Sequence, residues 1–374
     1  MTPMRRIAKL FLTLAMGMSA ITLNAQAMNT NHLSVRQQHL ITVAAFEAKG
    51  DLEHLRQALN AALDDKVSIN ELKEALSHLY AYTGFPRSLN GLGTLQKVLD
   101  ERREAGKADV EGKSATPVAA DFDALKEGTR VQTQLTGGRG FNYTFAPATD
   151  YYLKAHLFGD IFARDVLTFA DRELVTIGAL ASVKGIEPQL KSHMTGCQNM
   201  GVTADDLQAL TEVLQQNVGD IEGYRSRKAL AEITGKAFTE GRPVENQIFP
   251  KGNPNTAYAK YFIGNSYLAS LNEGGDFPLH NVTFEPRCRN NWHIHHKGGQ
   301  VLICVGGEGW YQAWGEPARK LHPGDVVNIP AEVKHWHGAT ADSWFQHIAI
   351  EVPAEGRSNE WLEPVTDEEY DKLK

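Results

Sequence analysis

The chain is poor in cysteine, in clustered basic residues and in long apolar stretches. Its 374 residues include three cysteines, at positions 197, 288 and 304, which is too few for a disulfide framework. No run of Lys or Arg stands out and the net charge is −7, so we expect no nucleic-acid partner. One mostly apolar segment, residues 10–23, is short for a membrane span. The composition, 42% hydrophobic and 22% charged, is typical of a soluble globular protein, and the length suits two or three domains.

The N-terminus has the pattern of an export signal. Three basic residues precede the apolar segment, and Ala25-Gln26-Ala27 follows it as a small-x-small cleavage site. We therefore predict a signal peptide over residues 1–27, cut between Ala27 and Met28. The mature protein is expected in the periplasm or outside the cell, with no membrane attachment. The alternative is an uncleaved membrane anchor.

Histidine, by contrast, is concentrated in one region. Eight of the fourteen histidines lie between His280 and His347. Two of them, His293 and His295, are two residues apart, so on a β-strand they share a face and can meet one ion. A Gly-Gly turn follows this pair, and a later segment rich in turn residues leads to a further histidine. We predict one metal site with the ligands His293, His295, Gln300 and His335.

The paired histidines resemble the first sequence motif of the cupin family, G-x5-H-x-H-x3,4-E-x6-G. His293 and His295 occupy its histidine positions, and Gly307 occupies its final glycine. Gln300 stands where the motif has glutamate, and Arg287 stands where it has its leading glycine. A neutral amide leaves a divalent ion its full charge. The glutamine therefore favours Lewis-acid chemistry over the dioxygenase chemistry of other cupins.

The second cupin motif, G-x5-P-x-G-x2-H-x3-N, fits from Gly324 to His335. Glu332 replaces its internal glycine and Ala339 its final asparagine. The resemblance implies a double-sheet β-barrel with a C-terminal tail over residues 245–374. The ligand set is similar to that of small metal cupins, which include cupin-type hydroxynitrile lyases. It implies one divalent transition metal, and Mn, Fe, Ni, Co and Zn all stay open because imidazole-rich sites accept several metals.

Two further histidines are expected to line the metal pocket without binding the ion. His347 lies in an alternating segment that is typical of a strand, and His280 lies on the strand before the first motif. If their faces point into the barrel, each can move a proton to or from a bound oxygen. Otherwise each packs or faces solvent. His337, which has the strand parity of His335, is the reserve ligand, and the acidic tail after Pro353 is expected to wrap the surface.

The region between the signal and the barrel contains an internal duplication. Ile41-Thr42-Val43-Ala44-Ala45 matches Val175-Thr176-Ile177-Gly178-Ala179, and further glycines and apolar residues match at one constant offset. Each copy has helical periodicity, and Ser68-x-x-Glu71 and Thr203-x-x-Asp206 have the pattern of capping boxes. Apolar helix stripes must be buried. The copies are therefore expected to pack on each other or on another subunit, and we expect a homo-oligomer.

These copies resemble the carboxymuconolactone decarboxylase-like family, an all-α family that also has peroxidase-type members. The resemblance rests on residues 171–177, on His193 followed by Gly201-Val202-Thr203, and on Tyr82-x-Gly84-Phe85-Pro86 in the first copy. The predicted fold class is multi-domain α and β, with all-α helical repeats before an all-β cupin (jelly-roll) barrel. The predicted units are a first repeat over residues 28–105, a linker over 106–120 and a second repeat over 121–240.

The helical repeats offer a second candidate site. His193 and Cys197 are four residues apart and share a helical face, so the histidine can activate the thiol. The peroxidase members of the family use a C-x-x-C pair, which neither copy has. The alternative is therefore a buried cysteine beside a packing histidine. Glu173 and His193 are candidate acid/base groups for a decarboxylase, and a scaffold role fits as well.

Two functional classes follow. The first is an exported metal-dependent lyase that acts on a small substrate with a hydroxyl or carbonyl group. The metal polarises that oxygen, and His347 or His280 transfers the proton. The second is a thiol peroxidase or decarboxylase centred on the helical repeats, with the barrel as a binding module. A non-catalytic sensor of small molecules is a third class, which fits an exported chain with a full ligand set less well.

Overall fold

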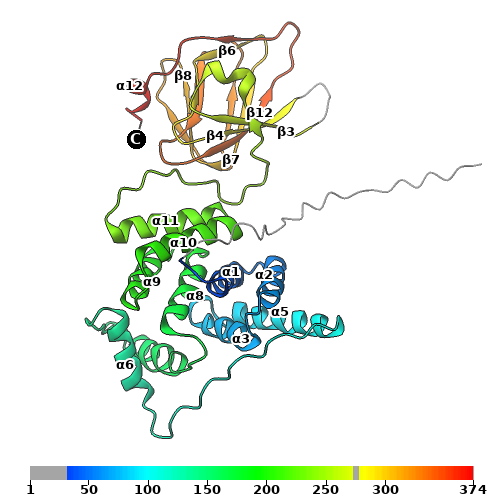
Figure 1. The fold of residues 1–374 in the computed structure, drawn as a ribbon. Helices are drawn as coiled ribbons and strands as arrows, with labels where there is room; N and C mark the ends of the chain where they lie inside the picture. The colour runs from blue at the N-terminus through cyan, green and yellow to red at the C-terminus, as the bar shows by residue number, and fades with distance from the viewer. Residues whose placement is uncertain (1–31, 273–277, 374) are drawn as a thin grey trace, which may run out of the picture.

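The computed structural model describes residues 32–272 and 278–373, so the predicted signal peptide and its cleavage site lie outside the described residues. Figure 1 shows a helical part that is followed along the chain by a β-barrel. No described helix has the length and apolarity of a membrane span.

The helical part is built around two corresponding helices, α1 (Val35–Lys49) and α8 (Phe169–Ala181), which make a long contact. Gly178 permits their close approach, because a Cβ at this position would lie 2.7 Å from the carbonyl oxygen of Ile41. The other elements of this part are α2 (Leu52–Asp64), α3 (Ile69–His78), α4 (Tyr80–Thr83), α5 (Phe85–Glu104), α6 (Ala124–Leu135), α7 (Pro147–Tyr151), the π-helix η1 (Tyr152–Ile161), α9 (Glu187–Asn199), α10 (Ala204–Asn217) and α11 (Asp220–Thr234).

Each repeat has its own apolar core, and each lends side chains to the other. Ile41 and Ala45 of α1 pack in the core of the second repeat, whereas Val175 and Ala179 of α8 pack in the core of the first. Because of this exchange, neither repeat buries its apolar stripe alone. The expected packing of the two copies on each other is therefore observed.

The helix starts that the sequence predicts are also present. Ser68 and Glu71 form a capping box at the start of α3, and Thr203 and Asp206 form another at the start of α10. Residues 106–120 run between the repeats without helix or strand.

The barrel consists of two sheets (Figure 1). One has the strand order β1-β3-β4-β12-β7-β10, and the other has the order β13-β6-β11-β5-β2, with β8 paired to β11 and β9 paired to β8. Apolar side chains such as Phe284, Leu302 and Phe345 form its core. The elements are β1 (Asn253–Pro254), the 3-10 helix η2 (Thr256–Tyr261), β2 (Phe262–Ile263), β3 (Ser266–Ser270), β4 (Leu279–Phe284), β5 (Arg289–Asn290), β6 (His293–His296), β7 (Gln300–Gly307), β8 (Gly309–Ala313), β9 (Arg319–Leu321), β10 (Val326–Ile329), β11 (His335–Ala339), β12 (Phe345–Glu351), β13 (Ser358–Trp361) and α12 (Asp367–Tyr370).

The C-terminal tail does more than wrap the surface, which corrects the expectation from its acidic composition. Its strand β13 runs antiparallel to β6, with Asn359 opposite His295 and Trp361 opposite His293. This pairing satisfies the backbone groups along one edge of β6, which would otherwise lack partners on that side. The tail therefore lies directly beside the predicted metal ligands.

Two departures from the cupin motifs lie at positions whose backbone conformation favours glycine. Arg287 has φ 67° and Glu332 has φ 66°, both in the left-handed region that favours glycine. Arg287 forms an ion pair of 2.7 Å with Asp371, and Glu332 accepts a 2.8 Å hydrogen bond from the Lys297 backbone. Both motif departures therefore place a larger side chain at a backbone position that favours glycine.

Candidate metal centre

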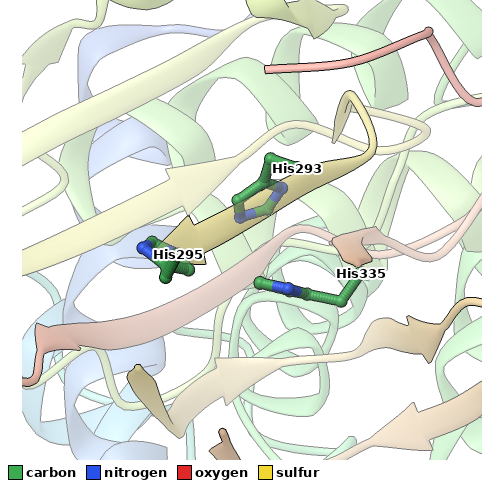
Figure 2. A group of neighbouring side chains, drawn as sticks. All are labelled: His293, His295 and His335. Carbon is green, nitrogen blue, oxygen red and sulfur yellow. The ribbon is translucent and has the colours of Figure 1, made fainter. Parts of the chain in front are cut away.

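Three of the predicted ligands lie together on two neighbouring strands. β6 alternates between buried and partly exposed positions, so His293 and His295 point inward while His296 points outward to Glu332 and Glu360. His335, the first residue of β11, is the direct partner of His293 in the antiparallel ladder. Figure 2 shows the three rings converging from these two strands.

The geometry of the three rings suits a single ion. One ligand nitrogen from each of the three residues lies within 4.8 Å of the others. The ring centroids are 4.1 Å apart for His293 and His335, and 5.1 Å and 5.3 Å from these two to His295. Nitrogens that are each about 2.0–2.1 Å from one ion lie within about 4.2 Å of one another, so this spacing needs only a small contraction to bind metal.

Hydrogen bonds fix which ring nitrogen is free. Each Nδ1 lies against an oxygen that can only accept, which places the proton on Nδ1 and the lone pair on Nε2. The three contacts are His293 Nδ1 to the Asn291 carbonyl at 3.0 Å, His335 Nδ1 to the Val333 carbonyl at 2.9 Å and His295 Nδ1 to Asn359 Oδ1 at 2.7 Å. This is the tautomer that a metal-binding imidazole needs.

The electrostatics agree with neutral ligands. Burial lowers the pKa of His335 to about 4 and, with the neighbouring imidazoles, holds the pKa of His293 well below its usual range. Burial also lowers the pKa of His295. The Nε2 atoms of His295 and His335 and the Oε1 atom of Gln300 are buried without a hydrogen-bond partner. Burial of polar atoms without hydrogen-bond partners costs folding free energy. These acceptor atoms together fit a cation.

Gln300 begins β7 in the opposite sheet and lines the same pocket as His293 and His295. The residues present therefore fit a divalent ion with three neutral imidazoles and one amide oxygen. Assignment of Gln300 as the fourth ligand stays a prediction.

The pocket in front of the histidines has a volume of about 240 Å³. His293 and His295 line it from the β6 sheet, His280 and His347 line it from the other sheet, and Phe262, Leu268 and Val282 are among its apolar lining residues. Both predicted proton-transfer residues, His280 on β4 and His347 on β12, line this pocket. The two ring nitrogens of His347 and the Nδ1 of His280 are buried without partners, and burial lowers the pKa of His347 to about 3.

The reserve ligand His337 is already engaged. Asn290 accepts a hydrogen bond from the His337 backbone through Oδ1, which directs its Nδ2 to the His337 ring, 3.0 Å from Nε2. The lone pair of that nitrogen is therefore used, and His337 supports the wall of the pocket instead. Its ring lies 4.8 Å from that of His347, centroid to centroid.

Sequence reasoning missed two residues at this centre, Asn359 and Trp361 of β13. Trp361 stacks on the His293 ring at 4.8 Å and on Tyr261 at 4.6 Å. The only signal in the sequence was the alternation of polar and aromatic residues in a tail that was expected to be a surface segment. The partner of this strand could not be read from the sequence.

The helical candidate site is partly assembled. Glu173 on α8 and His193 on α9 form a contact of 2.8 Å between Oε2 and Nδ1, and Glu173 is buried. Tyr82, from the first repeat, places its ring edge-on to that of His193 at 5.2 Å, with a buried hydroxyl that has no partner. Cys197 is buried in the apolar core, and burial, followed by the charge of Glu173, raises the pKa of its thiol. This environment opposes thiolate chemistry.

Comparison with known proteins agrees with this architecture. The sequence matches the carboxymuconolactone decarboxylase family over residues 18–97 and 147–230, and the cupin domain family over residues 280–350. An (R)-mandelonitrile lyase from Granulicella tundricola is 41% identical over 115 residues, which cover 30% of this chain and 87% of that protein. The chain belongs to the carboxymuconolactone decarboxylase and cupin families.

Two further relatives are similar to parts of the chain. A 4-carboxymuconolactone decarboxylase from Acinetobacter baylyi is 30% identical over 96 residues, which cover 24% of this chain and 71% of that protein. A solved cupin-like protein from Thermotoga maritima is 41% identical, covering 34% of this chain and 96% of that one, with a TM-score of 0.32.

A larger hollow, of about 550 Å³, lies between the helical repeats and the cupin domain. Its basic residues are largely neutralised, since Lys184 and Arg225 pair with Glu245, and Lys191 pairs with Glu232. None of the buried unpartnered polar atoms found among the described residues belongs to its walls. The smaller cupin pocket is therefore the better candidate for chemistry, despite its size.

Proposed function

We propose that the protein is an exported, metal-dependent lyase whose reaction takes place in the cupin pocket, on a small α-hydroxynitrile. The observation that carries the proposal is the set of three converging imidazoles, each with Nδ1 held by an oxygen. The similarity to an (R)-mandelonitrile lyase supports a lyase reaction and suggests the substrate class. Release of a carbonyl compound and hydrogen cyanide is the reaction we propose.

The size and the lining of the pocket suit such a substrate. A volume of about 240 Å³ is small for a ligand site, which favours a small molecule. Its apolar lining residues, Phe262 and Val282 among them, would contact the hydrocarbon part of the substrate. The hydroxyl group would then face His293 and His295, which line the same pocket.

A divalent ion held by the predicted ligands would act as a Lewis acid towards the substrate oxygen. His347, which is neutral because burial lowers its pKa to about 3, accepts the hydroxyl proton. The bond to the nitrile carbon breaks, the electron pair leaves with cyanide, and the carbonyl group forms. The low pKa of His347 favours return of the proton to cyanide, which completes hydrogen cyanide. His280 is the second group in the pocket that can carry this proton.

Cyanohydrin cleavage by the metal-loaded full-length protein tests the proposal. With mandelonitrile as substrate, we expect release of benzaldehyde above the rate without protein. His347→Ala should retain metal but lose turnover by about 100-fold or more, as for removal of a general acid/base. The control is His322→Ala, an exposed histidine of the same domain outside the pocket, which should keep full turnover. Equal turnover of His347→Ala and the control would remove His347 from the reaction, and no cleavage by the loaded protein would overturn the substrate class.

A second candidate function is acid/base catalysis at the helical site. The observation that favours it is the 2.8 Å contact between the Glu173 and His193 side chains, beside the unpartnered hydroxyl of Tyr82. We propose a decarboxylase-type activity here as the alternative to chemistry in the cupin pocket. An activity that is lost in His193→Ala and kept in His347→Ala would favour it.

A further inference from the structure

The structure assigns Asn359 a positioning role. Glu351 orients the side-chain amide of Asn359, and this amide in turn fixes the tautomer of His295. Nε2 of His295 is thereby prepared to bind metal. This inference rests on the proposed metal centre. His295 differs from the other two histidines in the kind of group that holds its Nδ1. Backbone carbonyls, which cannot rotate or donate, hold His293 and His335, whereas the Oδ1 atom of a side-chain amide holds His295 at 2.7 Å.

An amide has two orientations with opposite effects on the histidine. With Oδ1 towards His295, the ring is protonated on Nδ1 and Nε2 carries a lone pair. With Nδ2 towards His295, Nδ1 becomes the acceptor, Nε2 carries the proton, and the ring cannot bind a metal through that atom. Some other contact must therefore decide the orientation of Asn359.

Glu351 provides that contact. Nδ2 of Asn359 donates to Oε1 of Glu351 at 2.9 Å. A carboxylate only accepts, so rotation of the amide would place Oδ1 against a negatively charged oxygen. Glu351 is the last residue of β12 and pairs with Gln300 in the sheet. The series of hydrogen bonds from Glu351 to His295 therefore starts beside another predicted ligand. The pairing of β13 with β6 sets Asn359 opposite His295. Asn359 can therefore contact both His295 and Glu351.

Asparagine suits this position better than aspartate. Aspartate would accept the proton of His295 as well, but it would lie beside the Glu351 carboxylate and add like-charge repulsion. Alanine would accept nothing and would leave the His295 ring free to change tautomer. Loss of a polar group that orients a metal ligand typically weakens metal affinity by about 10- to 100-fold.

The test is a double-mutant cycle on metal affinity, measured by competition of the full-length protein with a chelator for Co²⁺, with the Co²⁺ visible absorption recorded for each variant. Asn359→Ala should weaken affinity about 10- to 100-fold and alter the absorption bands. Glu351→Gln should weaken affinity by a smaller factor, because glutamine also donates and no longer dictates one orientation. In the Asn359→Ala background, Glu351→Gln should have no further effect.

A matched control is Asn265→Ala. Asn265 is also exposed in the same domain and also donates to a carboxylate, that of Glu285 at 3.0 Å, but lies outside the pocket. Its affinity should equal that of the original protein. If Glu351→Gln lowers affinity by the same factor with and without Asn359, Glu351 acts through its charge and the positioning chain is wrong. If Asn359→Ala binds Co²⁺ normally while His293→Ala does not, this inference fails and the metal centre stands. If His293→Ala also binds normally, the proposed metal centre itself fails.

Discussion

Buried histidines without partners make the pocket sensitive to acid. The pKa of His347 is lowered to about 3, against an ordinary value of 6.5 in the unfolded chain. Above pH 6.5 His347 is neutral in both states, so its protonation makes no contribution to stability. As the pH falls through 6.5, the unfolded chain takes up a proton that the folded protein does not, so stability falls until about pH 3.

Removal of this group should therefore reduce the loss of stability in acid. At pH 5, about 1.5 units below the unfolded pKa, one such histidine costs on the order of 2 kcal/mol. Between pH 8 and pH 5 the unfolding free energy of both metal-free proteins should fall. We expect the fall to be smaller in His347→Gln than in the original protein by about that amount. Urea unfolding at the two pH values measures it. If the difference in unfolding free energy between His347→Gln and the original protein is the same at both pH values, the pKa of His347 is not lowered in the folded protein.

The thiol of Cys197 gives a second prediction at a single side chain. Its burial and the neighbouring charge of Glu173 raise its pKa, so thiolate is scarce at neutral pH. We expect iodoacetamide to label Cys197 in the folded protein only on the timescale of unfolding, as measured by mass spectrometry. Cys197→Ser should leave any activity of the full chain unchanged. Rapid labelling at pH 7.5 without unfolding would instead favour the thiol peroxidase hypothesis.

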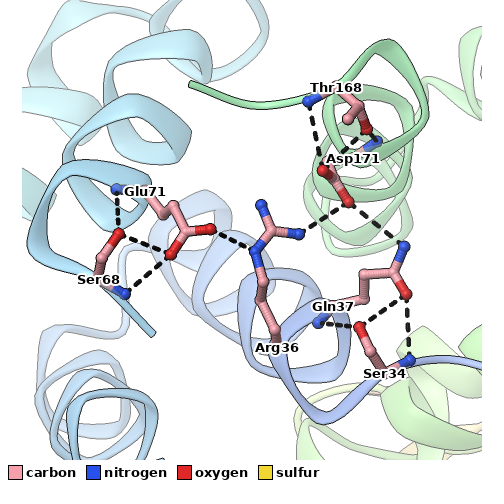
Figure 3. Close-up of polar contacts among 7 residues, drawn as sticks. All are labelled: Ser34, Arg36, Gln37, Ser68, Glu71, Thr168 and Asp171. Atoms are coloured by element: carbon pink, nitrogen blue, oxygen red, sulfur yellow. Dashed lines mark hydrogen bonds and ion pairs between the residues drawn. The ribbon is translucent and has the colours of Figure 1, made fainter. Parts of the chain in front are cut away.

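Among the helices, Arg36 joins the capping boxes of two helices that start far apart in the sequence. Figure 3 shows its guanidinium between Glu71, which caps α3, and Asp171, which caps α8. Burial alone would raise the pKa of Asp171, but the hydrogen bond and charge of Arg36 outweigh it and lower the pKa. One cation on α1 thus ties the start of α3, in the first repeat, to the start of α8, in the second.

Arg36→Ala should destabilise the helical part by about 2 kcal/mol, since it removes charged hydrogen bonds from two partly buried carboxylates. The control Arg103→Ala removes an exposed ion pair with Asp100 and should cost about 0–1 kcal/mol. Equal losses in urea unfolding for the two variants would mean that the Arg36 junction contributes no more than a surface pair.

The crossing of α1 and α8 allows a similar comparison between two glycines in helices. A Cβ at Gly178 would lie 2.7 Å from the Ile41 carbonyl oxygen, whereas a Cβ at Gly93 would meet nothing within 4 Å. Gly178→Ala should cost about 1–3 kcal/mol through displacement of α8, and Gly93→Ala should stabilise α5 by up to about 1 kcal/mol. A neutral result for Gly178→Ala in thermal unfolding would contradict the close packing of the two repeats.

For the molecule as a whole, local patterns in the sequence predicted much of the fold. Strand parity and motif spacing were enough to bring His293, His295 and His335 together, because these depend on a period of two residues and on short turns. The duplicated helices and their capping boxes were also local signals. The role of β13 could not be predicted from a local signal. Its pairing with β6 joins segments more than sixty residues apart, and such pairing produces no periodic pattern in the sequence. The engagement of His337 by Asn290 was invisible for the same reason.

Export remains a prediction about the whole chain, from residues outside the described part. Expressed in an exporting host, the soluble protein should begin at Met28, because Ala25-Gln26-Ala27 is the expected cleavage site. N-terminal sequencing measures this. Soluble protein that still begins at Met1 would contradict it. Light scattering tests the expected homo-oligomer in the same preparation, and a strict monomer at micromolar concentration would exclude it.

The central claim is that the cupin pocket holds one divalent ion on the converging histidines, and metal content tests it most directly. The full-length protein should be stripped with a chelator, reloaded, dialysed and analysed for metal per chain, in parallel with His335→Ala and the exposed-histidine control His322→Ala. We predict one tightly bound ion in the original protein and the control, and none in His335→Ala. Equal metal content in His335→Ala and the control, with both folded, would contradict the account.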